Sequence, residues 1–306
     1  MNEQNTRKPP FLLAPRFWPT WAGLALLRLI HTFPHSTRLW FGRKMGRAIG
    51  LLAKRRLKIA RRNIELCFPS KTEQEREEIV SRNFEYLGIS LIEGAMSWWS
   101  SPEEILAQVE FEGSHHLDQA LETGRGVILL SAHMTSLEIG VHIMGLKFGM
   151  AIMYRPLKNP VMDKLIRESR EKHSDSVFPR SDTRAMIRSL KQGKAVFYGF
   201  DQDYGARHSI FAPFFGIEAA TITATTRFAK ATGAIVVPYF PYQTDAGRYH
   251  VEILPPVEDF PGESIEADTR RLNEILEKAI LKAPEQYLWI HRRFKTRPEG
   301  EADVYN

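Results

Sequence analysis

Short apolar runs that alternate with helical patterns constrain the fold of this chain more than any other feature. The apolar runs are VILLSA (127–132), MAIMY (150–154), AVFYGF (195–200), AIVVPYF (234–240) and YHVEIL (249–254). The helical patterns cover residues 135–148, 160–172, 182–192 and 264–283. Continuous apolar strands separated by helices are typical of a parallel sheet with both faces covered. We therefore expect an α/β fold with a mostly parallel central sheet flanked by helices.

Length and composition favour one large domain. The chain has 306 residues, 43% of them hydrophobic and 25% charged, which is ordinary for a folded protein. A further helix is predicted from Thr72 to Met96, because Thr72 and Glu75 have the spacing of a capping box. The single cysteine, Cys67, excludes an intramolecular disulfide and a metal cluster built on thiolates.

The N-terminal region combines an apolar segment with a strongly basic one. Residues 4–64 contain fourteen Lys and Arg and no Asp or Glu, and FWPTWAGLALLRLIHTF (17–33) is apolar with tryptophans near its start. A full bilayer span needs about 20 mostly apolar residues, so 17–33 predicts a short or tilted membrane anchor. The alternative is an ordinary buried amphipathic helix. The basic flank fits an anionic membrane surface or an acidic carrier protein; no nucleic-acid motif accompanies it.

Polar residues follow three of the apolar runs at the point where each run ends. They are His133 after the first run, Arg155 after the second, and Asp201 with Asp203 after the third. Ligands of open α/β sheets bind beyond the carboxyl ends of the strands. The sequence therefore predicts a shared cleft at this edge of the sheet.

His133 and Glu138 form a candidate catalytic pair in SAHMTSLEIG (131–140). A carboxylate that hydrogen-bonds an imidazole fixes its tautomer and stabilises the imidazolium formed when histidine accepts a proton. Two structural alternatives remain open for this stretch. Thr135 and Glu138 have the spacing of a capping box, and His133 alone fits a hydrogen-bonded histidine at a strand end.

Several stretches of the chain resemble the late acyltransferases of lipid A biosynthesis, which transfer lauroyl, palmitoleoyl or myristoyl groups. The matching stretches are RRNIELCFP (61–69), SAHMTSLEIG (131–140), YRPLKNP (154–160), DQDYGARHSIFAPFFG (201–216) and APEQYLWIHRRFKTRPEG (283–300). Glu138 occupies the acidic position of the H-x-x-x-x-D/E motif that this family shares with glycerol-phosphate acyltransferases. The P-E-G-T-R signature of the glycerol-phosphate branch is absent, which argues against a phospholipid precursor as acceptor.

The resemblance implies the reaction and its location. Acyl carrier protein would donate a fatty acyl thioester, and a 3-hydroxyl of the Kdo-bearing lipid A precursor Kdo2-lipid IVA would accept it, without metal, cofactor or covalent enzyme intermediate. Lauroyl is the first expectation, palmitoleoyl the second and myristoyl the third. Residues 1–36 would anchor the chain in the inner membrane of a Gram-negative bacterium. Residues 37–306 would form the acyltransferase domain, glycerol-phosphate acyltransferase-like in fold and facing the cytoplasm.

The resemblance also implies roles for individual residues. His133 and Glu138 would activate the hydroxyl, and Arg155 would stabilise the oxyanion or hold a phosphate of the acceptor. The residues expected to shape the substrate site are Tyr154, Asn159, Asp201, Asp203, His291, Arg292, Arg293 and Lys295. Those expected to wall the acyl chain are Phe211, Phe214 and Phe215.

Two other classes of function remain open on the residues alone. Asp201 and Asp203 form D-x-D, a weak pattern that also occurs in metal-dependent glycosyltransferases. A membrane-associated binding protein without catalytic activity is the other alternative. Dependence on a divalent metal and a sugar nucleotide distinguishes the first, and lipid binding without acyl transfer distinguishes the second.

Overall fold

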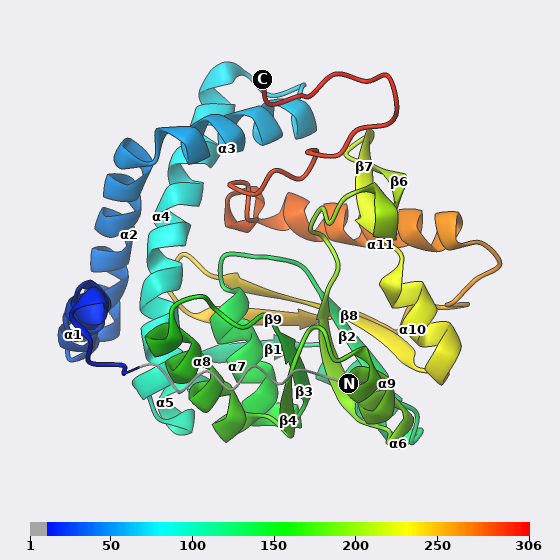
Figure 1. Cartoon of the computed structure of the whole chain (residues 1–306), viewed down its shortest axis with the longest axis horizontal. Coiled ribbons are helices and arrows are strands. Elements are labelled where there is room, and N and C mark those ends of the chain that lie inside the picture. The colour runs from blue at the N-terminus through cyan, green and yellow to red at the C-terminus, as the bar shows by residue number, and fades with distance from the viewer. Residues whose placement is uncertain (1–10) are drawn as a thin grey trace.

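A seven-stranded sheet lies at the centre of the computed structural model, which describes residues 11–306 (Figure 1). Its strands are, in spatial order, β1 (Val109–Glu112), β9 (Tyr249–Ile253), β8 (Ile235–Gln243), β2 (Val127–Ser131), β5 (Ala195–Gly199), β3 (Ala151–Tyr154) and β4 (Ser176–Pro179). All neighbouring strands pair in parallel except β8 and β9, which are antiparallel. The expected mostly parallel sheet is therefore confirmed.

All five apolar runs of the sequence form strands of this sheet, and two further strands were not expected. Strands β1 and β4 have four residues each and lie at the two edges. The side chains of β1 are intermediate or exposed, and β4 buries only Phe178. Short edge strands that are covered on few sides carry no continuous apolar run, so the pattern used to find the central strands does not detect them.

Helices cover both faces of the sheet. They are α1 (Trp18–His31), α2 (His35–Leu52), α3 (Lys54–Cys67), α4 (Glu73–Trp99), α5 (Pro102–Leu106), α6 (Ser114–Glu122), α7 (Leu137–Phe148), α8 (Pro160–His173), α9 (Thr183–Lys191), α10 (Ala224–Thr232) and α11 (Ile265–Lys282). Alternate residues of β2 enter two different cores. Ile128 and Leu130 pack with residues of α9, α10 and α11, whereas Val127 and Leu129 pack with residues of α6 and α7. This alternation follows from the pleat of the strand.

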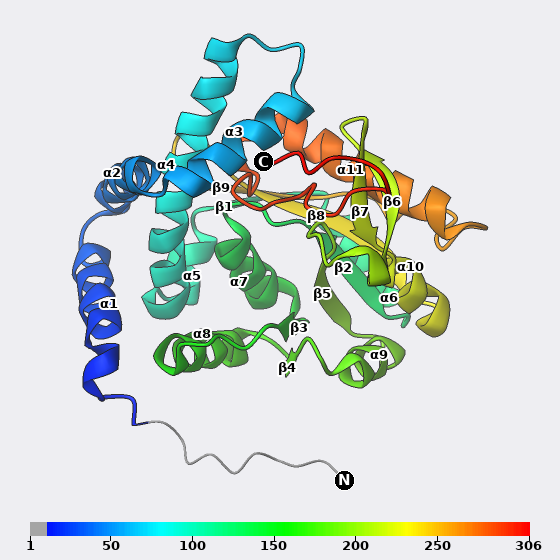
Figure 2. The same ribbon diagram turned by 45° about the horizontal axis from the view of Figure 1, so that its top comes forward.

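The N-terminal helices lie together at one edge of the molecule, away from α9 and α10 (Figures 1 and 2). Helix α2 packs very closely against α4 at Gly46, where a Cβ atom would lie 2.0 Å from the carbonyl oxygen of Phe84. Helix α4 begins at the expected capping box, with both the Thr72 and the Glu75 side chains bonded to backbone N–H groups.

The predicted anchor lies partly outside the described residues, which begin at Phe11. Helix α1 has 14 residues, and within residues 11–306 no helix has the length and apolar character that crossing a bilayer requires. Several large apolar side chains of α1 are nevertheless exposed, among them Trp18, Leu26 and Leu29. The anchor and the boundary at residue 36 therefore stay predictions.

A small hairpin stands apart from the main sheet. Strands β6 (Ser209–Phe214) and β7 (Ile217–Ile222) pair antiparallel and are joined through Phe215 and Gly216, which both have positive φ. The hairpin packs against α11. It contains the three phenylalanines expected to wall an acyl chain, and its position decides which of them face a cavity.

Candidate functional site

His133 and Asp201 meet because the strands that precede them are neighbours in the sheet. Ser131 of β2 pairs with Gly199 of β5, so the residues two positions beyond each strand end lie side by side. The Nδ1 atom of His133 is 2.7 Å from Oδ1 of Asp201, and the backbone N–H of His133 donates to Oδ2 over 3.0 Å. A Cβ atom on Gly199 would lie 3.2 Å from Cε1 of His133, so a glycine at this position leaves room for the imidazole.

Asp201 is an acceptor of hydrogen bonds in this arrangement. Its side chain is only 2% exposed, and Tyr287 also donates a hydrogen bond to Oδ2 over 2.9 Å. Burial raises the pKa of Asp201, but the charge and hydrogen bonds of His133 lower this pKa by a larger amount. The pKa of Asp201 therefore lies below its ordinary value. The carboxylate therefore accepts the Nδ1–H of His133, which leaves Nε2 as the basic nitrogen.

The same contact changes the basicity of His133. Burial lowers the pKa of His133, but the charge and hydrogen bond of Asp201 raise it more, so that the pKa lies above its ordinary value. Nε2 has no hydrogen-bond partner within residues 11–306. An imidazole oriented by a buried carboxylate with a free Nε2 is the arrangement of a general base.

Glu138 does not form the expected hydrogen bond with His133. Both oxygens of Glu138 instead accept hydrogen bonds from the guanidinium of Arg170, with 3.2 Å between Nε and Oε1. Glu138 lies on the first turn of α7, and Arg170 lies on α8, which packs beside it. The capping-box alternative is also wrong, because α7 begins after Ser136 without a side-chain cap. Spacing in the sequence did not reveal Arg170 as the partner.

A cavity of about 800 Å³ opens at His133. Tyr154 and Arg155 line it together with His133, as expected at the ends of β2 and β3, whereas Asp201 and Asp203 do not line it. Two arginines that the sequence did not single out, Arg180 and Arg227, also line it. Its apolar lining consists of Met153, Phe197, Ile222 and Ala224. Among residues 11–306 no acidic side chain lines the cavity, so it suits a ligand with an anionic group and an apolar chain.

The segment that carries Tyr287 to the site is held by two buried asparagines. Asn83 of α4 donates to the carbonyl oxygens of Glu285 and Tyr287, and Asn63 of α3 donates to those of Trp289 and His291. The backbone N–H of Leu288 donates to the carbonyl oxygen of His133 over 2.9 Å. No pattern in the sequence marks these asparagines as functional, because the role of a buried amide in a helix is recognised only when its hydrogen-bond partners are known.

The comparisons with known proteins show the family of the chain. Residues 6–296 match the family model described as bacterial lipid A biosynthesis acyltransferase. The chain belongs to this family. The lauroyltransferase of lipid A biosynthesis from Escherichia coli (strain K12) is 39% identical over 98% of this chain and 100% of its own. The palmitoleoyltransferase of the same strain is 38% identical over 96% of both chains, and the myristoyltransferase is 34% identical over 95% of this chain and 91% of its own.

One solved structure is remotely similar to this lipid A acyltransferase. The 1-acyl-sn-glycerophosphate acyltransferase PlsC from Thermotoga maritima is 20% identical, with a TM-score of 0.39 over 79% of this chain and 98% of that chain. The family model and the curated relatives, not this likeness, make the protein an acyltransferase.

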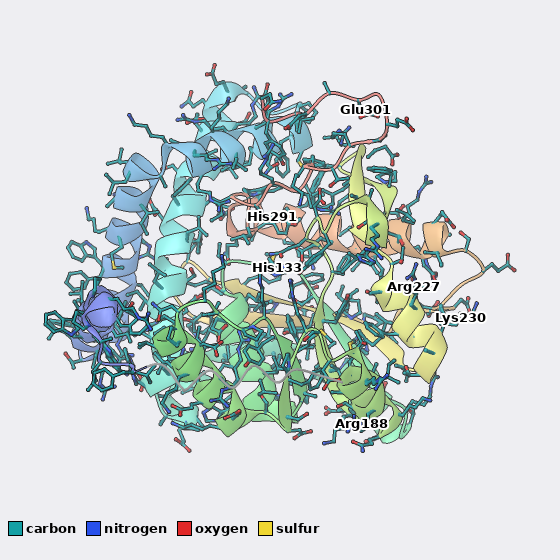
Figure 3. All side chains as sticks on the ribbon, in the orientation of Figure 1. His133, Arg188, Arg227, Lys230, His291 and Glu301 are labelled. Atoms are coloured by element: carbon teal, nitrogen blue, oxygen red, sulfur yellow. The ribbon has the colours of Figure 1, made fainter. Side chains whose placement is uncertain are left out.

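The C-terminal basic residues of this acyltransferase do not form one surface. Arg293 is buried and donates to Ala220 O and Thr221 Oγ1, and Arg292 pairs with Asp303. Lys295 donates to the carbonyl oxygen of Asp203. His291 lies close to His133 (Figure 3), and burial lowers its pKa to about 4, so that it is uncharged at neutral pH.

Asp203 has a different role from Asp201. Its carboxylate accepts hydrogen bonds from Gly205 and from both the backbone and the hydroxyl of Thr296, so it fastens the C-terminal segment. The two carboxylates of D-x-D thus turn to separate partners. Within residues 11–306 no group of three or more His, Cys, Asp or Glu is placed to hold a metal ion. The geometry gives the glycosyltransferase alternative no support, and the family match decides against it.

The remaining residues expected at the substrate site lie elsewhere. Asn159 caps the N-terminus of α8 and donates to the Thr20 hydroxyl. Phe214 is fully buried beneath the Arg293 guanidinium, and Phe215 packs on Phe68. None of Phe211, Phe214 and Phe215 lines the cavity at His133. The apolar wall of that cavity comes from β3, β5, the end of β7 and the start of α10 instead.

Proposed function

We propose that this acyltransferase transfers a fatty acyl group from acyl carrier protein to a 3-hydroxyl of Kdo2-lipid IVA, the phosphorylated glycolipid precursor of lipid A. One observation carries the proposal: the His133–Asp201 pair opens into a cavity that combines unpaired arginines with an apolar wall. Lauroyl is the preferred acyl group, because the lauroyltransferase is similar over the whole of its own length. Palmitoleoyl and myristoyl groups remain the alternatives.

His133 is the general base of the proposed reaction. Nε2 takes the proton of the acceptor hydroxyl while Asp201 stabilises the resulting imidazolium. The alkoxide oxygen attacks the thioester carbonyl, a C–O bond forms, and the C–S bond breaks. The imidazolium then returns the proton to the departing thiolate, so that the thiol of the carrier and the new ester are the products.

Three arginines supply positive charge to this cavity. Arg155, Arg180 and Arg227 are exposed, and none forms a salt bridge within residues 11–306. Arg155 follows β3 directly, beside the strand that precedes Asp201. We assign Arg155 to the oxyanion or to an acceptor phosphate, because a guanidinium remains charged and offers a planar set of donors.

Glu138 contributes to catalysis through Arg170 in this proposal. Their ion pair connects the first turn of α7, which follows the His133 loop, to α8. Glu138 is therefore a positioning residue, whereas His133 and Arg155 contact the reacting groups. Asp203 and Lys295 shape the site indirectly by fastening the C-terminal segment.

The exposed face of α1 attaches the protein to the inner membrane from the cytoplasmic side in this proposal. Trp18, Trp21, Leu26 and Leu29 are 40–63% exposed, and an isolated soluble domain gains nothing from such a series on one helix. Residues 1–36 are then the membrane-binding part and residues 37–306 the acyltransferase domain. Tryptophan and leucine on a helix with basic flanks suit the lipid headgroup boundary.

A transfer assay tests this function. Acyl carrier protein with a labelled lauroyl group is incubated with Kdo2-lipid IVA, and the labelled lipid product is measured. We expect transfer by the unmodified protein and a loss of about 10²- to 10⁴-fold in His133→Ala. Undiminished transfer by folded His133→Ala would overturn the mechanism. Mass spectrometry of the product identifies the acyl chain that is preferred.

A further inference from the structure

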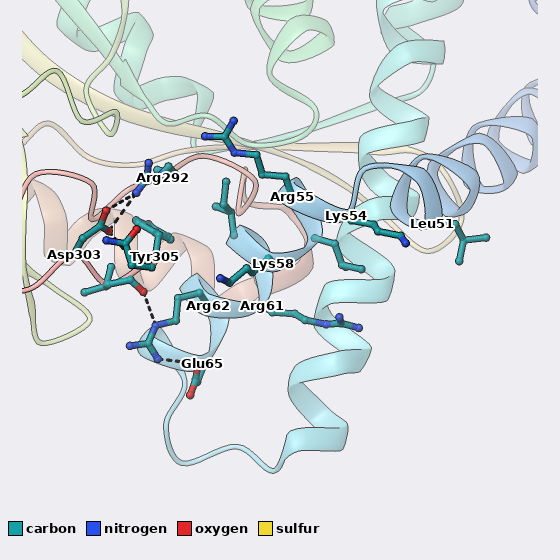
Figure 4. Close-up of a pocket in the computed structure, with 14 residues that line it drawn as sticks. Leu51, Lys54, Arg55, Lys58, Arg61, Arg62, Glu65, Arg292, Asp303 and Tyr305 are labelled. Atoms are coloured by element: carbon teal, nitrogen blue, oxygen red, sulfur yellow. Dashed lines mark hydrogen bonds and ion pairs between the residues drawn. The ribbon is translucent and has the colours of Figure 1, made fainter.

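A second hollow of about 1000 Å³ runs along α3, away from the cavity at His133. We call it the α3 hollow; it is lined mainly by α3 and by residues 303–306 at the end of the chain (Figure 4). The basic residues that line it are Lys54, Arg55, Lys58, Arg61, Arg62 and Arg292. Of its apolar lining residues on α3, Leu57 is half-buried and Ile59 is buried, so the exposed side chains between Lys54 and Arg61 are cationic; Leu51, at one end of the hollow, is exposed.

Three of these cations are already paired with acids. Glu65 pairs with Arg62, and Asp303 pairs with Arg292, as Figure 4 shows. Arg61 pairs with Glu77 outside the hollow. The other three cations, Lys54, Arg55 and Lys58, have no acidic partner within residues 11–306.

These three unpaired cations lie on the first turns of one helix. Lys54 and Lys58 are four positions apart, a spacing at which like charges repel and destabilise the helix slightly. They also lie at the N-terminal end of α3, where the helix dipole disfavours positive charge. The arrangement therefore lowers the stability of the free protein, which is the expected cost of a surface that binds an acidic partner.

One backbone segment connects the α3 hollow to the catalytic site. Asn63 and Arg56 of α3 donate to carbonyl oxygens of residues 289–291. The preceding residue, Leu288, donates its backbone N–H to the carbonyl oxygen of His133. His291 accepts a hydrogen bond from the backbone N–H of Asp203. The next residue, Arg292, lines the hollow. This segment thus contacts both α3 and the backbone of His133.

We propose that the α3 hollow is the docking surface for the acidic carrier protein that delivers the acyl thioester, an inference that rests on the proposed function. Charge complementarity identifies the partner: carboxylates on its surface neutralise Lys54, Arg55 and Lys58. Opposite charges on two proteins mainly accelerate their association and select the partner. Docking here places the carrier beside the segment that borders His133.

Two other anionic partners fit the α3 hollow less well. The acceptor lipid has its own unpaired arginines, Arg155, Arg180 and Arg227, in the cavity that contains His133. A membrane surface is bound through exposed apolar side chains interspersed with cations. The series of exposed apolar side chains lies on α1, whereas the α3 hollow has the exposed Leu51 at one end and cations along α3. The hollow is concave and its exposed lining is mainly basic, which suits the convex surface of a folded acidic protein.

Charge reversal of two hollow residues tests the proposal with the full-length protein. In Arg55→Glu/Lys58→Glu we expect the KM for the acylated carrier protein to rise roughly tenfold or more, because like charges across an interface are unfavourable. The kcat at saturating carrier and the KM for the acceptor lipid stay unchanged. Raising the salt concentration raises the carrier KM of the unmodified protein, and it does so less in the variant.

A matched control removes the same number of positive charges at a distant place. Arg188→Glu/Lys230→Glu alters α9 and α10, at the edge of the molecule far from α3 (Figure 3), and leaves every KM unchanged. The milder Arg55→Gln/Lys58→Gln raises the carrier KM by a smaller factor and serves if charge reversal impairs folding. All variants are compared by thermal unfolding before kinetics are measured.

The outcomes separate this proposal from its competitors and from the proposed function. A rise in the KM for the acceptor lipid alone assigns the α3 hollow to phosphates of the acceptor and overturns the proposal. Loss of binding to vesicles that contain anionic lipid, with the carrier KM unchanged, assigns it to the membrane and also overturns it. An unchanged carrier KM in a variant that transfers normally rejects docking at α3, whereas absence of transfer by the unmodified protein rejects the function itself.

Discussion

The Nδ1 atom of His133 and the Oδ1 atom of Asp201 lie 2.7 Å apart, although 68 positions separate the two residues in the chain. Parallel pairing of β2 with β5 produces this contact, because Ser131 pairs with Gly199 and the two side chains lie two positions beyond these paired residues. Tyr287 completes the pair from a third segment. The carboxylate that orients the imidazole is therefore supplied by the neighbouring strand and not by the adjacent helix.

Replacing Asp201 by Asn tests this pairing. Asp201→Asn removes the charge that raises the pKa of His133 and leaves the burial that lowers it, so the pKa of His133 falls. Loss of activity on acidification then occurs at lower pH than in the unmodified protein, because a general base works only when neutral. The rate falls by about 10²- to 10⁴-fold. NMR titration of the His133 ring measures the pKa directly, and Asp118→Asn, on the exposed side of α6, is the control.

The Glu138–Arg170 ion pair predicts a coupled effect of two substitutions. Glu138→Gln and Arg170→Gln each weaken the connection between α7 and α8 and lower the free energy of unfolding by about 1 to 3 kcal/mol. The double variant loses less than the sum of the two, since each residue acts through the other. Denaturant unfolding of all four proteins gives the coupling energy. A strictly additive result, with kcat reduced by Glu138→Gln only, would mean that Glu138 acts on the substrate directly.

Glu93 predicts an unusual dependence of stability on pH. This glutamate of α4 is fully buried, and burial raises its pKa to about 8, although the Ser136 hydroxyl donates to it. A group whose pKa is raised by folding favours the folded state most below its unfolded pKa, and this contribution disappears as the pH rises through the folded pKa.

The free energy of unfolding of the unmodified protein should therefore decrease between about pH 4.5 and about pH 8. Glu93→Gln keeps the shape of the side chain but does not titrate, so this part of the decrease disappears. Urea unfolding at several pH values measures it. Glu274→Gln, on the exposed side of α11, should leave the pH dependence unchanged.

The apolar wall of the cavity at His133 predicts how chain-length preference changes. Ala224 lines this cavity at the start of α10, and Ala224→Phe fills part of it. We expect preference to shift toward shorter acyl groups by about tenfold or more in kcat/KM, since each methylene in such a pocket is worth about 1 to 3 kcal/mol. Competition between acyl carrier donors of two chain lengths measures the shift. Ala231→Phe, on the exposed side of the same helix, is the matched control, and an equal shift in both variants would contradict this assignment.

Exposed leucines of α1 predict reduced membrane binding without loss of folding. Leu26 and Leu29 are 53% and 58% exposed. Leu26→Ser/Leu29→Ser removes apolar contacts worth about 0.8 kcal/mol per methylene transferred to lipid, so vesicle binding weakens while the melting temperature is nearly constant. Flotation with vesicles and thermal unfolding measure the two quantities. The side chain of Leu281 on α11 is also 58% exposed, and Leu281→Ser should not alter flotation.

The sequence by itself determined the central strands of this fold and one edge of the site. Apolar runs predicted β2, β3, β5, β8 and β9, because burial on both faces requires consecutive apolar residues. The position of His133 and Arg155 after two such strands predicted their common cavity. The capping box at Thr72 was predicted correctly because its hydrogen bonds join residues three positions apart.

Only the tertiary structure decided which side chains act on one another. Glu138 is near His133 in sequence but bonds to Arg170, while Asp201 and Tyr287 are distant in sequence and complete the histidine site. Strand register and helix packing determine these contacts, and neither appears in local spacing. The same reason applies to Asn63, which joins α3 to the segment beside His133. It applies also to the cations of the α3 hollow, because the position of the surrounding acids decides which of them are paired.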